Sequence, residues 1–242
     1  TSFWILKPIK KSLFIQFYDA SGFTIFGWHM LAAQAELLAK VMNMIVAIGA
    51  VVVFSWLSRS FRRQQLTYIF SGFFVACHIL YSFLLTSTGD AVVWSFYLYG
   101  DLFSTLMVAT FFVFLNDSVT PDAAKRLYGL IGLGGVAGGV FGASALRLWI
   151  NRFSNQEWLF ICAGIAVVII VLAAFAGKAA GANRIADETA SVHLVSEAPA
   201  GNSAFEGAML VFNSRYLLAI AAVVGLYEII STLLDFQFTT TI

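Results

Sequence analysis

Long apolar stretches recur along the chain, with shorter polar segments between them. About 20 consecutive apolar residues are enough for a helix to cross the hydrocarbon core of a bilayer. The first stretch covers about residues 1–17, and the later ones cover 36–57, 66–86, 91–115, 127–150, 158–176 and a stretch that begins near 216. This pattern predicts seven membrane-spanning helices and no other large element.

Composition supports a lipid environment. Hydrophobic residues make up 60% of the 242 residues and charged residues only 11%, whereas soluble domains average about 25% charged residues. The mean hydropathy is +0.85. We therefore predict an all-α, polytopic membrane helix bundle.

Charge and cysteine content exclude two other kinds of site. A net charge of +1 without a basic stripe argues against a nucleic-acid partner. Both cysteines, Cys77 and Cys162, lie inside apolar stretches and give no support for a disulfide or a metal site.

The segment 177–215 differs from the rest because it is rich in Ala, Gly, Ser and charged residues. We expect it to be a cytoplasmic linker between a six-helix bundle at 1–176 and the truncated start of a second bundle at 216–242. Within it Phe205, Met209, Leu210 and Phe212 recur near helical spacing. They fit either an interfacial helix or a short solvated helix.

Basic residues concentrate in alternate loops, which sets the expected orientation because cytoplasmic loops retain Lys and Arg. The loop between the third and fourth stretches offers only Asp90, and Arg152 is a small exception in the loop between the fifth and sixth. We predict a cytoplasmic N-terminus. The residues on the cytoplasmic side are Arg59, Arg62, Arg63, Lys125, Arg126, Lys178, Arg184 and Arg215.

Three lysines lie on one face of the first stretch. Lys7, Lys10 and Lys11 are spaced i, i+3 and i+4, with Pro8 among them. A cationic face of this kind suits the phosphate or carboxylate of a solute in a water-filled cavity. The alternative is that these side chains snorkel to the headgroups at one end of the helix.

An acidic residue, Asp101, lies at least ten residues from either end of the predicted fourth span, too deep to snorkel. Tyr97, Ser104 and Thr105 share its side of the helix. This carboxylate could bind a cation, carry a proton, or pair with a lysine of the first span.

The seventh stretch is also acidic. Glu228 and Asp235 are two helical turns apart and project to nearly the same side. We expect this acidic face to meet the lysine face of the first helix across a central cavity. Glu36 and Lys40 are predicted to form an ion pair at the outer end of the second span, and His78 is predicted to be a packing histidine.

Glycines dominate one face of the fifth stretch, where a helix backbone can approach a neighbour closely. Two hypotheses stay open: the face seals a static dimer, or it lets two bundles slide during alternating access. The glycines concerned are Gly134, Gly135, Gly138, Gly139 and Gly142.

Six spans, a linker and a further span are typical of the N-terminal half of a major-facilitator-type transporter plus its seventh helix, although channels and membrane enzymes also begin with six spans. Short motifs add a resemblance to the nucleotide-exchange (ATP/ADP translocase) transporters of plastids and intracellular bacteria and their bacterial relatives. The matching stretches are Ile5-Leu6-Lys7-Pro8-Ile9-Lys10, Tyr97–Phe103 followed by Asn116, Ala124–Tyr128 with Gly132–Gly134, and the spacing of Tyr227 and Asp235.

This resemblance implies that Lys7, Lys10, Asp101 and Asp235 line a substrate site, and it implies a bacterial inner membrane. Tyr97, on the side of Asp101, and Glu228, on the side of Asp235, are included in the predicted substrate site. The chain departs from the family in having Asp where the family usually has Glu. It also has Phe236-Gln237-Phe238-Thr239 where a Trp-Lys stretch is expected.

From these observations we predict a secondary transporter, an antiporter of an anionic solute such as a nucleotide, that works by alternating access. Lipid, the solute, and either the second half of the same chain or other membrane subunits are its expected partners. No cofactor is expected, and no nucleophile and base stand at a spacing that would indicate an enzyme. The alternative is a non-transporting subunit that uses the same fold as a scaffold or sensor.

Overall fold

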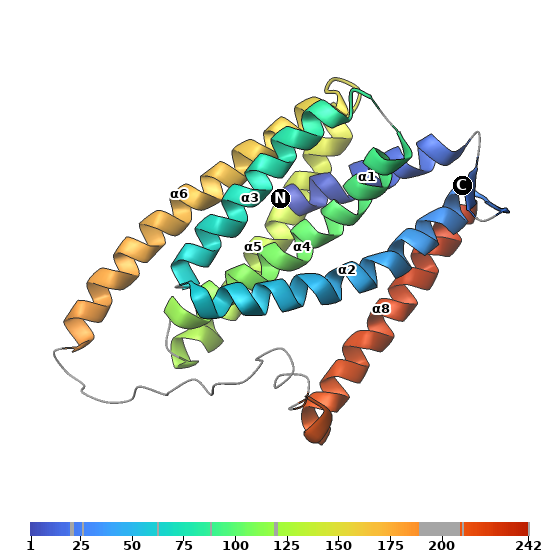
Figure 1. The fold of residues 1–242 in the computed structure, drawn as a ribbon. Helices are drawn as coiled ribbons and strands as arrows, with labels where there is room; N and C mark the ends of the chain where they lie inside the picture. Colours follow the sequence, from blue (N-terminus) through green and yellow to red (C-terminus); the bar gives the residue numbers. More distant parts are fainter. Residues whose placement is uncertain are drawn as a thin grey trace.

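The structure is a computed structural model that describes residues 1–19, 22–25, 27–61, 63–87, 89–118, 121–188, 209 and 211–241. Within those ranges it describes the backbone, but not the side chains, of 59, 63–64, 116–118, 121–126, 177–188 and 238–241. Long helices dominate it (Figure 1). They are α1 (Ser2–Asp19), α2 (Ala32–Ser60), α3 (Arg63–Leu84), α4 (Asp90–Ser118), α5 (Pro121–Trp149), α6 (Asn155–Glu188) and α8 (Arg215–Thr241).

Six of the described helices, α2, α3, α4, α5, α6 and α8, are long and apolar enough to cross a membrane. The remaining one, α1, has 18 residues and carries the three lysines. It packs against α2, α4, α5 and α6. The chain is therefore a multi-pass, helical integral membrane protein, as the sequence predicts at this level of detail.

A short hairpin joins α1 to α2, where the sequence analysis expects only a loop. Strand β1 (Phe23–Ile25) pairs antiparallel with β2 (Trp28–Met30), and Phe23 lies opposite Met30. Gly27 in the turn has a φ of 82°, a conformation that glycine adopts at little cost. The purely helical description is thus incomplete at this end of the bundle.

Helix α6 continues beyond the apolar stretch. Its backbone stays helical to Glu188, so 177–188, expected to be part of the linker, continues α6 past its apolar span, which ends at Ala176. Alanine, the strongest helix former, is frequent there. The proposed interfacial helix falls largely outside the described residues, although Met209 and Phe212 are described and both are exposed.

The packed interior is formed by α1, α3, α4 and α6. Ile5, Leu6 and Ile9 of α1 are buried together with Phe74 of α3 and Leu159 of α6. Large apolar side chains also cover the outside of the bundle, including on α6 Val168, Leu172 and Phe175. An apolar exterior of this kind is expected where the surrounding solvent is lipid.

His78 lies in this interior, as predicted for a packing histidine. Its ring is fully buried, and Nδ1 lies 2.6 Å from the Phe74 carbonyl oxygen and 2.9 Å from the Tyr99 hydroxyl. The ring also meets Phe103 edge-on, with centroids 5.1 Å apart. His78 therefore holds α3 against α4.

The glycine face of α5 has two parts. A Cβ at Gly139 would lie 2.9 Å from Nε1 of Trp4, and one at Gly142 would lie 2.9 Å from the backbone oxygen of Thr1. At Gly134 and Gly135, a Cβ would meet nothing within 4 Å. One part of the face thus allows close packing of α1 inside the bundle, and the other part is open among the described residues.

We predict that Gly142→Ala lowers the thermal stability of the full-length protein in detergent. The added methyl group would press on the backbone oxygen of Thr1, directly before α1, which cannot rotate away as a side chain could. Overpacking of this kind costs about 1–3 kcal/mol. Gly134→Ala is the matched control and should leave the melting temperature unchanged or slightly higher, since its space is open. Equal losses in both variants would contradict the packing described here.

Candidate functional site

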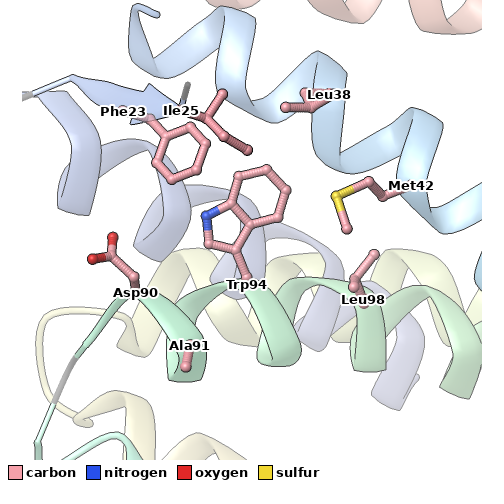
Figure 2. A pocket seen from close by; sticks show the side chains of 8 residues that line it. All are labelled: Phe23, Ile25, Leu38, Met42, Asp90, Ala91, Trp94 and Leu98. Carbon is pink, nitrogen blue, oxygen red and sulfur yellow. The ribbon is translucent and has the colours of Figure 1, made fainter. Parts of the chain in front are cut away.

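A pocket of about 300 Å³ lies where the hairpin meets α2 and α4 (Figure 2). Trp94 stands in its centre, and Asp90 lies at its edge. The hydroxyl of Tyr18 donates a hydrogen bond of 2.5 Å to Asp90 and accepts one of 2.9 Å from Trp94 Nε1. Apart from Asp90 the lining is largely apolar, and the lysines of α1 are not part of it. The lining residues are Phe23, Ile25, Leu38, Met42, Asp90, Ala91, Trp94 and Leu98.

The polar chemistry lies deeper, between α1 and α4. The Nζ atom of Lys10 forms an ion pair with Oδ1 of Asp101 and lies 4.4 Å from the centroid of the Tyr97 ring. Lys10 is 4% exposed, so its charge is shielded from solvent. The carboxylate and the ring face together balance this cation.

Gly100 makes this pairing possible. A Cβ at Gly100 would lie 2.6 Å from Cδ of Lys10, because the lysine stem crosses the surface of α4 at that point. Any residue larger than glycine must displace the stem. Gly100 is not among the residues predicted from the sequence to be functional, and its position next to Asp101 is the signal that points to it.

We therefore expect Gly100→Ala to expose Lys10. The displaced amine should react faster with an acylating reagent, as measured by mass spectrometry of the modified full-length protein. Gly72→Ala is the control, because a Cβ there meets nothing within 4 Å. An unchanged rate of Lys10 acylation in Gly100→Ala would show that the Lys10 side chain can accommodate the added methyl group without leaving its ion pair.

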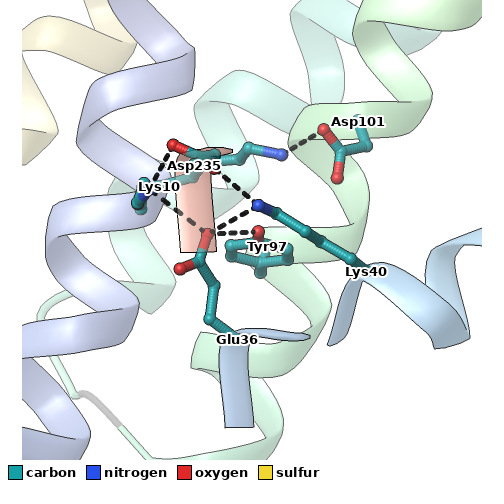
Figure 3. Close-up of polar contacts among 7 residues, drawn as sticks. Lys10, Glu36, Lys40, Tyr97, Asp101 and Asp235 are labelled. Carbon is teal, nitrogen blue, oxygen red and sulfur yellow. Dashed lines mark hydrogen bonds and ion pairs between the residues drawn. The ribbon is translucent and has the colours of Figure 1, made fainter. Parts of the chain in front are cut away.

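A second group of charges joins α1, α2 and α8 beside the first (Figure 3). Lys40 lies 2.5 Å from Oδ2 of Asp235, and Lys11 lies 2.6 Å from Oδ1 of the same carboxylate. Both amines also reach Oε1 of Glu36, at 3.5 Å from Lys40 and 3.7 Å from Lys11. Glu36 is 2% exposed and accepts a hydrogen bond of 3.1 Å from the Tyr97 hydroxyl. Tyr97 thus connects the two groups.

Together these six charges form what we name the ionic cluster: Lys10, Lys11, Lys40, Glu36, Asp101 and Asp235. Three positive and three negative side chains leave it formally neutral. A single ionisable side chain in a membrane interior costs about 2.5–3.5 kcal/mol on insertion scales, so mutual pairing accounts for their presence. Four helices contribute to the cluster.

The cluster lies toward the hairpin end of the bundle. At 1.5 Å per residue, Glu36 is about 6 Å from the first residue of α2 and Asp101 about 16 Å from the first residue of α4. By the same rise, Asp235 is about 9 Å from the last residue of α8. That end of α8 lies beside the start of α2 (Figure 1).

The structure brings together four of the six substrate-site residues predicted from the sequence: Lys10, Tyr97, Asp101 and Asp235. Lys7 is exposed, with its Nζ 5.7 Å from the Phe3 ring and no ion pair to any described residue. Glu228 is exposed too and makes no described hydrogen bond or ion pair. Their assignment to a substrate site stays a prediction.

Three features of the cluster differ from the sequence-based expectation. Lys11, which is not among the predicted substrate-site residues, is the α1 lysine that meets Asp235, while Lys10 forms its ion pair with Asp101. The predicted pair of Glu36 and Lys40 is present, but it belongs to the larger cluster rather than standing alone at a helix end. Nor does Lys10 face a water-filled cavity, because its side chain is buried.

Among the described side chains, no three His, Cys, Asp or Glu residues are grouped to hold a metal ion. The chemistry available in the cluster is therefore that of its lysines and carboxylates, which can hold charged groups and exchange partners. Comparison of the chain with protein-family models, with curated proteins and with solved structures found no match. The fold and the site together identify a multi-pass helical membrane protein with an ionic cluster between four of its helices.

Proposed function

We propose that the protein is a secondary transporter that carries an anionic solute across the membrane by alternating access. The observation that supports this proposal is the ionic cluster, in which lysines and carboxylates from α1, α2, α4 and α8 meet inside a lipid-embedded bundle. Charged side chains at such depth commonly mark a solute pathway. Ion pairs between different helices are also contacts that can be exchanged when helices move.

The charges favour an anion as the solute. Each lysine of the cluster is paired with a carboxylate in this structure, so the site is neutral when empty. A solute carboxylate or phosphate can replace one of these internal acids on the lysines without leaving a cation unpaired. A cationic solute would instead have to compete with the lysines for Asp101, which is held by the buried Lys10.

Helix α8 is the helix that moves in the proposed transport cycle. In the alternating-access scheme it begins the second half of the transporter, and Asp235 is its ionic contact with the first half. Release of that contact would open the hairpin end of the bundle, which the predicted orientation places outside. The nucleotide assignment rests on the motif resemblance, and antiport follows from the same resemblance.

The test is an exchange measurement with the full-length protein in liposomes. Vesicles are loaded with unlabelled ADP, and labelled ATP is added outside. A labelled nucleoside, which has no phosphate and no charge, is the uncharged probe. We expect uptake of ATP that requires internal ADP and no uptake of the nucleoside. Exchange of other anions but not of nucleotides would remove the nucleotide assignment, and uptake of neither nucleotides nor other anions would overturn the proposal.

A second candidate is a non-transporting subunit that acts as a scaffold or sensor. It is favoured by the open glycine face at Gly134 and Gly135, beside the exposed Leu133 and Val136, where another membrane helix could pack closely. Gly134→Leu should then disrupt assembly with a partner, as judged by chromatography in mild detergent. In that case Lys10→Gln should leave the function of the assembly intact.

A further inference from the structure

Among the described residues, helix α8 contacts the rest of the structure near its last turns. Every side chain from 215 to 231 is exposed, and the half-buried side chains that follow are Thr232, Asp235 and Phe236. Its packing against other described helices is mainly with α2. The charged Asp235 is therefore one of three half-buried side chains through which α8 meets the bundle.

The two carboxylates that share Lys11 and Lys40 are held very differently. Glu36 is 2% exposed, accepts the Tyr97 hydroxyl and lies on a helix that packs against α1 and α4. Asp235 has 39% of its side chain exposed. Glu36 is thus the enclosed acid and Asp235 the accessible one.

The geometry at Asp235 is that of a bound anion. Each of its two oxygens forms an ion pair with a different lysine: Oδ1 lies 2.6 Å from Nζ of Lys11, and Oδ2 lies 2.5 Å from Nζ of Lys40. The nearest oxygen of Glu36 is about 1 Å farther from each amine. Two ammonium groups that converge from α1 and α2 can hold two oxygens of a carboxylate or a phosphate in the same way. Removal of Asp235 leaves these two cations with one nearby carboxylate.

We propose that Lys11 and Lys40 form an anion-binding pair, that Asp235 is its internal occupant, and that a phosphate or carboxylate of the solute displaces Asp235 there. The inference rests on the proposed function, and it names which cations take the solute. Their side chains are 25% and 23% exposed, whereas that of Lys10 is 5% exposed and held by Asp101. Displacement of Asp235 releases the ionic contact of α8, so binding of the solute and movement of this helix are the same event.

The test is equilibrium binding of labelled ATP to the full-length protein in detergent. Asp235→Asn removes the competitor with little change of shape, so we expect it to bind ATP at least tenfold more tightly than wild type. Lys11→Gln and Lys40→Gln should each bind at least tenfold more weakly. Asp19→Asn makes the same chemical change at the exposed end of α1, outside the ionic cluster, so it is the matched control and should bind like wild type.

A second variant and a measurement on the native protein distinguish a specific effect on ATP binding from an effect of misfolding. Asp235→Glu keeps the internal anion, so its affinity should stay near that of wild type. In the wild-type protein, ATP should suppress carbodiimide cross-linking of Asp235 to Lys11 or Lys40 and leave the cross-link of Lys10 to Asp101 unchanged.

Different outcomes separate the inference from the proposed function. ATP exchange in liposomes with equal or weaker ATP binding by Asp235→Asn overturns the inference and leaves the transporter proposal standing. Unchanged cross-linking of Asp235 at saturating ATP has the same meaning. Absence of both exchange and binding of ATP in wild type and in Asp235→Asn overturns the inference together with the nucleotide assignment.

Discussion

The Asp101→Asn variant is expected to be less stable than the wild-type protein by about 3–5 kcal/mol, the range measured when one partner of a buried ion pair is removed. The side chain of Lys10 is 5% exposed, so its cation would lose the carboxylate with which it forms an ion pair and remain enclosed between Tyr97 and Gly100. Denaturant unfolding of the detergent-solubilised, full-length protein measures the loss. Asp19→Asn, at the exposed end of α1, is the control and should have almost no effect.

The double variant Lys10→Met/Asp101→Leu distinguishes an unpaired charge from general damage. Replacing both members of a buried ion pair by apolar residues is often neutral or stabilising, because no charge is left to be solvated. We expect this variant to regain most of the stability that Asp101→Asn loses. Losses that simply add between the two single substitutions would indicate that the pair is not coupled.

The second large effect is expected on exchange. Lys10→Gln should lower the initial rate of ATP uptake into ADP-loaded vesicles at least tenfold, which corresponds to about 1.4 kcal/mol in the barrier. Without this cation the cluster carries an excess of negative charge and repels an anion. Arg147→Gln, on the exposed last turn of α5, removes a positive charge outside the cluster and should transport at the wild-type rate.

The neutral double variant also separates folding from transport. Lys10→Met/Asp101→Leu is expected to fold but not to exchange ATP, because it has lost the ion pair that links α1 to α4 within the ionic cluster. Uptake at the wild-type rate by this variant would show that the pair is purely structural. The scaffold hypothesis would then gain support.

The helices could be predicted from the sequence because the bilayer requires a long apolar run for each span, and such runs are visible without any knowledge of packing. The depth of Asp101 likewise predicted a partner, since an unpaired carboxylate there is costly. The hairpin could not be predicted in this way. Its strands have three residues each, and they depend on a turn at Gly27 rather than on a long pattern.

The identity of the partners could not be deduced either. Lys7, Lys10 and Lys11 lie on one side of α1, yet their environments range from exposed to buried, because pairing depends on how α1 crosses α2, α4 and α8. Glu228 shows the same limit. It shares a helical face with Asp235, but α8 touches the bundle only near its end, so just one of the two acids reaches a lysine.

The contact between Asp235 and the lysines of α1 and α2 is the feature on which the proposed transport mechanism most directly depends. A membrane-permeant carbodiimide joins a carboxylate to an amine only when the two are in contact, and mass spectrometry of the native full-length protein then identifies the joined residues. We predict amide cross-links from Asp235 to Lys40 or Lys11, together with the internal standard Lys10–Asp101. Recovery of Lys10–Asp101 without any cross-link from Asp235 would contradict the ionic cluster and the transport mechanism built on it.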